Sequence, residues 1–177
     1  MRAYKFLARG AVGPFSGFAW PTPTRGAPDA WVVAQRPLEP CRHGVHVCRE
    51  TDLAHWLHEE LWELEVDGGS VEGVDCLVVE RARLVRRIDA WSDGGAGRFA
   101  AACIARAAAL VGPTPAVALA ALVDDAALAL EHGYPAIAAF NAALAVARGA
   151  GDVEAAYAAE RAWQSGWIGR ELILPSR

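Results

Sequence analysis

The pattern of apolar residues changes abruptly near position 93, and this change constrains the fold more than any other feature. Before it, short apolar runs rich in β-branched and aromatic residues alternate with Gly and Pro, as in strands joined by turns. After Asp93-Gly94-Gly95, alanine-rich segments repeat their apolar residues at the helical spacing of about 3.6. We therefore predict an α+β fold: a small, mainly antiparallel β-sheet half with one helix (residues 1–92), packed against a C-terminal α-helical bundle (residues 93–177) with one shared core.

The boundaries of the elements follow from the same patterns. Strands are expected at residues 3–8, 30–35, 44–48, 62–66, 76–80 and 83–88. The segment 66–71 is predicted to be a turn, because Asp-Gly and Gly-Gly adopt positive φ easily. One helix is expected after Thr51. Others are expected at residues 96–111, 114–131, 135–148 and 152–168, with Asp152 capping the last.

Charge and composition argue against several classes of partner. The formal net charge of −4 leaves no basic footprint for nucleic acid, and no run reaches the roughly 18 apolar residues of a membrane span. The first residues lack the apolar core of a signal peptide, so the four cysteines are expected to be reduced thiols in a cytoplasmic protein. Lys5 is the only lysine, which fits a GC-rich coding bias.

The densest group of chemically capable side chains lies in residues 41–48. Cys41, His43, His46 and Cys48 have the composition of a Cys₂His₂ zinc site. Zinc ligands usually come in pairs from two separated segments, whereas one strand points successive side chains to opposite faces. We therefore expect no metal site here, but a turn and a strand that carries a hydrogen-bonded histidine.

The helix expected after Thr51 carries a second polar group. His55 and Glu59 are four residues apart and can meet on one helix face, with His58 beside them. This spacing does not match the zinc-protease helices, so the face is interpreted as solvated. Its histidines could still approach the 41–48 segment across a tight turn.

One acidic pair stands out in the helical half. Asp124 and Asp125 interrupt an otherwise apolar segment. Burial would raise the pKa of such a pair and suit it to proton transfer, whereas a wet stripe on a surface helix is the plainer interpretation.

These features predict a small-molecule enzyme or ligand-binding protein with its site near residues 41–48. His43, His46 and Cys48 are the candidate catalytic residues, with histidine as general acid or base because its pKa lies near neutrality. Aromatic side chains of the 13–20 loop could cover a pocket. The candidate ligand-binding residues are Phe15, Phe18, Trp20, His55 and Glu59. The cofactor is left unknown, since the P-loop, dinucleotide-binding and nucleophile-elbow motifs are all missing.

A non-catalytic interaction module is the alternative hypothesis. In that case the alanine-rich bundle presents a helical face near Trp163 and Trp167 to a partner protein or to a second copy in a homodimer.

Five segments follow one another over most of the chain: AYKFL, PFSGFAWP, LEPCRHGVHVC, LAHWLHEELWELEV and RARLVRRIDAW. Together they resemble an uncharacterised protein family common in high-GC actinobacteria. This resemblance implies no activity. The pattern C-x-x-G-x-H-x-C, at Cys41, Gly44, His46 and Cys48, is also distantly similar to a small bacterial and phage domain of unknown function.

Residues 44–66 also look like the strand–helix–strand segment of ADP-ribosyltransferase-type folds. That similarity implies a nucleotide-binding fold in which a small set of side chains organises NAD. The counterparts in this chain would be His43, Trp56 and Glu80, with Trp in place of the family's Tyr or Ser.

Overall fold

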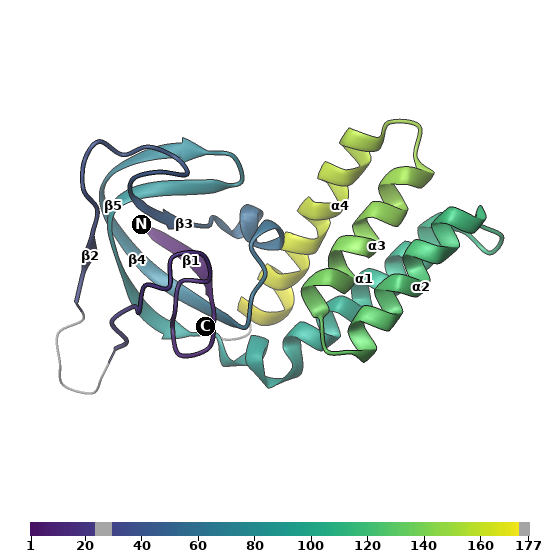
Figure 1. Ribbon diagram of the computed structural model, residues 1–177, viewed down its shortest axis with the longest axis horizontal. Coiled ribbons are helices and arrows are strands. Elements are labelled where there is room, and N and C mark those ends of the chain that lie inside the picture. Colours follow the sequence, from purple (N-terminus) through teal and green to yellow (C-terminus); the bar gives the residue numbers. More distant parts are fainter. Residues whose placement is uncertain (24–29, 174–177) are drawn as a thin grey trace. The chain divides into compact units, whose positions relative to one another are not determined.

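The computed structural model describes residues 1–23 and 30–173 (Figure 1). The fold is α+β, with an antiparallel sheet followed by a helical C-terminal part, which confirms the predicted fold class. The chain divides into two compact units that meet in the sequence between Ser92 and Asp93. The N-terminal unit contains β1 (Arg2–Leu7), β2 (Val32–Val33), β3 (Val45–Val47), the 3₁₀ helix η1 (Glu50–His55), β4 (Glu60–Gly73) and β5 (Cys76–Arg87).

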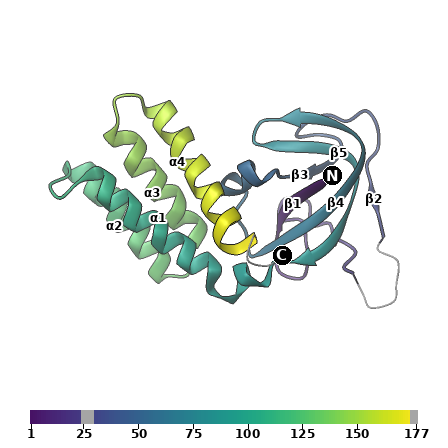
Figure 2. The same ribbon diagram turned by 180° about the vertical axis from the view of Figure 1, so that it is seen from behind.

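The strands of this unit form one antiparallel sheet that closes on itself. In the described part of the chain its order is β1-β4-β5-β2, and β3 pairs with β5. Tyr4 and Cys48 exchange two main-chain hydrogen bonds, of 2.8 and 2.7 Å, which join β1 to the residue after β3. Since β1 also lies alongside β4 (Figure 2), the pairing returns to the strand from which it starts.

The inner face of the closed sheet carries a continuous apolar core. Alternate residues of its strands supply this core, among them Ala3, Leu7, Val45, Val47, Trp62, Leu64, Val66, Leu77, Val79 and Leu84. Lys5 stands between Ala3 and Leu7 in the same row of β1, because side chains two residues apart share a face. The sheet therefore directs its only lysine toward its interior.

The hairpin of β4 and β5 turns later than predicted, so the expected turn at 66–71 is wrong. The pairing of Asp67 with Arg81 is followed by that of Ser70 with Val79, which leaves a bulge inside β4. A Cβ on Gly68 would overlap the side chain of Glu80, and one on Gly69 would make a tight contact with the same carboxylate, so the glycines allow this close approach. The chain reverses instead at Val74-Asp75, where Asp75 has a φ of 53°.

The helix expected after Thr51 is also wrong in its extent. Only η1 forms, and it ends at His55. Glu60 already belongs to β4, where it pairs with Leu7 of β1. Ladder hydrogen bonds to β1 thus override the local helical pattern, as tertiary context commonly does.

The described C-terminal unit consists mainly of four α-helices. These are α1 (Ala96–Val111), α2 (Val117–Glu131), α3 (Pro135–Gly149) and α4 (Val153–Ile168), with the kinked turn η2 (Trp91–Gly95) before them and η3 (Gly169–Ile173) after them. Helix α3 contacts each of the other three, and its buried residues are all alanines, whose small side chains allow close packing. Asp152 Oδ1 accepts the Ala155 N–H at 3.0 Å, as its predicted cap role requires.

One described segment, Trp91–Val111, is long and apolar enough to cross a membrane by length and composition alone. A helix that contributes to a protein core passes the same test, so this is weak evidence for a span. Phe99 and Cys103 are buried within the helical unit, and Arg106 is paired with Glu160 of α4.

Candidate functional site

Glu60 anchors the loop that carries the predicted aromatic residues. Its carboxylate accepts the main-chain N–H groups of Gly10 and Ala11 and the indole N–H of Trp62, each at 3.0 Å. Burial alone would raise the pKa of Glu60, but these hydrogen bonds and the nearby Arg87 hold that pKa below its usual value. The ionised carboxylate therefore fixes the chain where it leaves β1.

Beyond this anchor the loop folds back on itself. The Trp20 N–H donates to the Ala11 carbonyl at 2.9 Å. Phe18 packs edge-on against Trp20 with ring centroids 6.0 Å apart, and Phe15 packs against Trp56 at 6.3 Å. The loop thus presents a set of aromatic rings to the structure beneath it.

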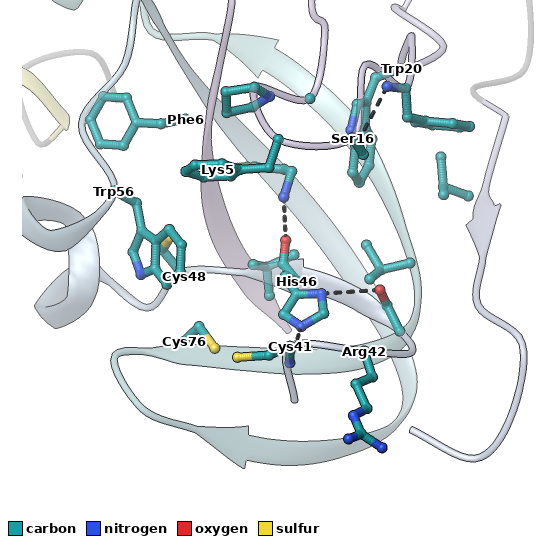
Figure 3. A pocket seen from close by; sticks show the side chains of 18 residues that line it. Lys5, Phe6, Ser16, Trp20, Cys41, Arg42, His46, Cys48, Trp56 and Cys76 are labelled. Carbon is teal, nitrogen blue, oxygen red and sulfur yellow. Dashed lines mark hydrogen bonds between the residues drawn. The ribbon is translucent and has the colours of Figure 1, made fainter. Parts of the chain in front are cut away.

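A cavity of about 580 Å³ lies beneath this loop, beside β1 and β3 (Figure 3). Its apolar lining includes Phe6, Pro14, Phe15, Phe18, Trp20, Val32, Val45, Val47 and Trp56. Three thiols, Cys41, Cys48 and Cys76, also line it. Among the described lining residues the only nitrogen bases are Lys5, Arg42 and His46, and none carries a carboxylate. This mixture of many apolar groups and few polar ones is typical of small-molecule sites.

The cavity gathers five of the predicted site residues, which are Phe15, Phe18, Trp20, His46 and Cys48. No family model, curated protein or solved structure matches this chain. Its function therefore has to be inferred from the chemistry of the cavity.

Lys5 is the most unusual group in the cavity. Its Nζ donates to the main-chain oxygen of His46 at 2.6 Å and lies 5.5 Å from the centroid of the Trp20 ring (Figure 3). No described carboxylate lies within ion-pair distance of this amine. Burial lowers the pKa of Lys5, and the neighbouring Cys48 and Cys76 oppose that shift only in part.

His46 is held by both ring nitrogens. Nε2 accepts the main-chain N–H of Cys41 at 2.9 Å, and Nδ1 lies 3.2 Å from the Gly44 carbonyl, to which it donates (Figure 3). Burial, and then the charge of Lys5, lower the pKa of His46. The imidazole is therefore neutral, closes the 41–46 turn, and has no free nitrogen for proton transfer to a ligand.

The thiols of the cavity differ in accessibility. Cys41 is exposed, whereas Cys48 and Cys76 are buried. Burial raises the pKa of Cys48 to about 12, with only partial relief from Lys5, and burial also raises the pKa of Cys76. Because the thiolate is the nucleophilic form, Cys48 is a poor nucleophile at neutral pH.

Three predicted site residues lie away from the cavity lining. His43 is exposed on the turn before β3. His55 Nδ1 lies 3.4 Å from a carboxylate oxygen of Asp75, and Glu59 accepts the main-chain N–H of Arg9 at 2.8 Å. Because η1 ends at His55, the expected helix face that would join His55 to Glu59 does not form.

The counterparts suggested by the ADP-ribosyltransferase resemblance do not meet at this site. Trp56 lines the cavity and donates its indole N–H to the Asp75 carbonyl. His43 is absent from the described lining, and Glu80 is paired with Arg36. The nucleotide-binding hypothesis therefore gains no support from this placement.

The structure does not gather the remaining candidate groups, the acidic pair of α2 and the possible metal ligands, into a second site. Asp124 and Asp125 are both exposed on α2, as in the wet-stripe interpretation. Within residues 1–23 and 30–173, no set of three or more His, Cys, Asp or Glu side chains is arranged to hold a metal ion.

The two tryptophans chosen for the interaction hypothesis are only partly exposed in the helical unit. Arg106 stacks over Trp163 at 4.6 Å, and Trp167 packs against Phe99 at 5.6 Å. Use of this face for a partner or a homodimer stays a prediction.

Lys5 is the main residue of the site that sequence reasoning missed. Its position two residues from both Ala3 and Leu7, inside an apolar strand, was the available signal. A lysine in the inward-facing row of a strand is unusual, since lysine is rarely buried without a partner. A coding bias would account for the rarity of lysine in this chain, but not for the position of its one lysine in β1.

Proposed function

We propose that this protein binds a small molecule with an apolar body and an oxygen-bearing head group in the cavity beside Lys5. The observation that carries the proposal is the lining, in which aromatic and aliphatic side chains surround one desolvated amine, with no carboxylate among the described lining residues. An amine in such surroundings favours an electron-rich oxygen as its partner. The cavity volume of about 580 Å³ falls in the range usual for small-molecule sites.

The contacts of the two histidines favour ligand binding over a reaction in which a histidine acts as general acid or base. Both ring nitrogens of His46 are engaged within its own turn, and His43 does not line the cavity. Among the described lining residues, the basic groups left for a ligand are Lys5 and, at an exposed position, Arg42.

We place this function in the cytoplasm. Cys41, Cys48, Cys76 and Cys103 are all free thiols, as expected in a reducing compartment. No step of the proposal needs a cofactor.

Calorimetric titration with two probes of one shape, phenylacetate and phenethylamine, tests the proposal. Phenylacetate is expected to bind, and phenethylamine to bind at least tenfold more weakly, because its cation would face Lys5.

Phe15→Ala should weaken phenylacetate binding without unfolding the protein, since Phe15 is 88% exposed. Phe140→Ala is the matched control, an exposed ring on α3 of the other unit, and should bind like the wild type. Equal binding of the acid and the amine, or no effect of Phe15→Ala, would overturn the proposal.

A further inference from the structure

We infer that Lys5 captures an aldehyde covalently, as an imine, within this cavity. The inference rests on the proposed function, because the same cavity must first accept the apolar body of the aldehyde. It adds the chemical class of the ligand and the atom that reacts, Nζ of Lys5.

The position of the amine carries the inference. Lys5 lies in the inward-facing row of β1, and its side chain reaches a cavity lined mostly by apolar groups (Figure 3). One hydrogen bond, to the main-chain oxygen of His46, orients Nζ and leaves the lone pair of a neutral amine free to react. A carboxylate partner would hold the amine as an ammonium, and none of the described residues supplies one at ion-pair distance.

The surroundings also favour the reactive form of the amine. Burial lowers the pKa of Lys5, which increases the neutral fraction at a given pH. The buried Cys48 does not compete for the aldehyde, because its pKa of about 12 keeps it a thiol.

The reaction consumes only the amine and the aldehyde. The Nζ lone pair attacks the carbonyl carbon, and one amine proton passes to the carbonyl oxygen to give a carbinolamine. The hydroxyl then leaves with the second amine proton as water, and a C=N bond remains between Nζ and the former carbonyl carbon. No oxidant or reductant takes part, and the imine is released again by the reverse addition of water.

The chain itself provides an internal standard for a test of this chemistry. In a preparation that starts at Met1, the primary amines are Lys5 and the α-amino group of Met1, because the sequence has no other lysine. Ordinary lysines have a pKa about 2.5 units above that of ordinary α-amino groups, so reductive alkylation at pH 7 normally favours an α-amino group over a lysine. Labelling of Lys5 ahead of Met1 is therefore diagnostic of an activated amine.

The experiment treats the full chain with phenylacetaldehyde and sodium cyanoborohydride at pH 7. The reductant converts an imine into a stable secondary amine, which intact-mass and peptide mass spectrometry locate. We expect one adduct, on Lys5, formed at a rate that saturates with aldehyde concentration and is suppressed by phenylacetate. The rate should reach its plateau at a pH below 10.5, the ordinary pKa of lysine. Lys5→Arg should leave only slow labelling of Met1, and Lys5→Met serves the same purpose if the arginine disturbs folding.

The failures of the two proposals are distinguishable. Phenylacetate binding together with labelling confined to Met1 would overturn the imine while leaving the binding function intact. Labelling of Lys5 that neither saturates nor responds to phenylacetate would also overturn it, since capture would then not depend on the cavity. Loss of both phenylacetate binding and Lys5 labelling would overturn both proposals.

Discussion

Nζ of Lys5 donates a hydrogen bond of 2.6 Å to the main-chain oxygen of His46, and this bond links β1 to β3 at the cavity. The two residues come from segments 41 positions apart in the chain. The charge of Lys5 contributes to the low pKa of His46, after the larger effect of burial. The amine of Lys5 and the imidazole of His46 therefore form one polar cluster within the mostly apolar lining of the cavity.

His46→Gln should destabilise the protein by about 1 kcal/mol at pH 7, because the exposed Cys41 N–H loses its protein acceptor. The pKa of His46 is lowered by folding, so the unfolded chain binds this proton at a higher pH than the folded protein does. The wild type should therefore lose stability as the pH falls below 6.5 toward the folded pKa, and His46→Gln should lose less. Urea unfolding between pH 5 and pH 8 measures both effects.

His43→Gln is the control for this prediction. It removes an exposed imidazole three residues away and neither of the two bonds made by His46, so its free energy of unfolding at pH 7 should match that of the wild type. A His46→Gln variant as stable as the wild type at pH 7 would contradict the role assigned to the ring.

Glu60→Gln should destabilise the protein by about 2 kcal/mol or more at pH 7, because three hydrogen bonds to a buried carboxylate lose their charge. The pKa of Glu60 is lowered by folding, so its stabilisation is complete above about 4.5 and is lost as the pH falls through the folded pKa. The difference between variant and wild type should therefore shrink in acid. Glu59→Gln, at a neighbouring exposed carboxylate, should cost less than about 1 kcal/mol. Equal losses in the two variants would show that Glu60 is no special anchor.

Gly44→Ala should be among the most damaging substitutions in the N-terminal unit. Gly44 has a φ of 131°, and a Cβ there would overlap Cγ1 of Val78 on β5. Backbone strain and the steric clash together should cost at least about 3 kcal/mol. Gly10→Ala is the matched control, because Gly10 also has positive φ but no atom within 4 Å of the added Cβ. Thermal unfolding that ranks Gly10→Ala below Gly44→Ala in stability would contradict the packing described for β3.

The four cysteines should differ sharply in their reactivity toward a thiol reagent at pH 7.5. Cys41 is exposed, whereas burial raises the pKa of both Cys48 and Cys103 to about 12 and also raises that of Cys76. Reaction with dithionitrobenzoate should thus show one fast thiol in the native protein and four in urea. Cys41→Ser should abolish the fast phase, and fast labelling of Cys48 would contradict the burial on which the chemistry of the cavity depends.

The sequence correctly predicted the features that depend on residues close together in the chain. The predicted bounds of α1 to α4 lie within a few residues of those observed. They followed from the helical spacing of the alanine-rich segments, the glycines and prolines between these segments, and the Asp152 cap. Alternation likewise predicted β1 and β3 closely. These elements are set mainly by short-range propensities and capping, which a linear pattern contains.

The errors occur where local signals have more than one structural solution. Asp67-Gly68-Gly69 fits a hairpin turn or a bulge equally well, and only the pairing of Ser70 with Val79 decides between them. The segment after Thr51 has a helical period, yet its later residues complete a ladder with β1. In both cases hydrogen bonds to a distant strand outweigh the local preference.

The sequence by itself predicted the fold class and placed the candidate site within residues 13–65, the part of the chain to which most of the residues lining the cavity belong. Only the tertiary structure decided which of those side chains meet. Tyr4 pairs with Cys48, the sheet closes, and Lys5 is enclosed beside His46 and away from described carboxylates. The physical reason is that burial and the pKa of Lys5 depend on groups that converge from β1, β3 and the aromatic loop, and no local pattern contains that convergence.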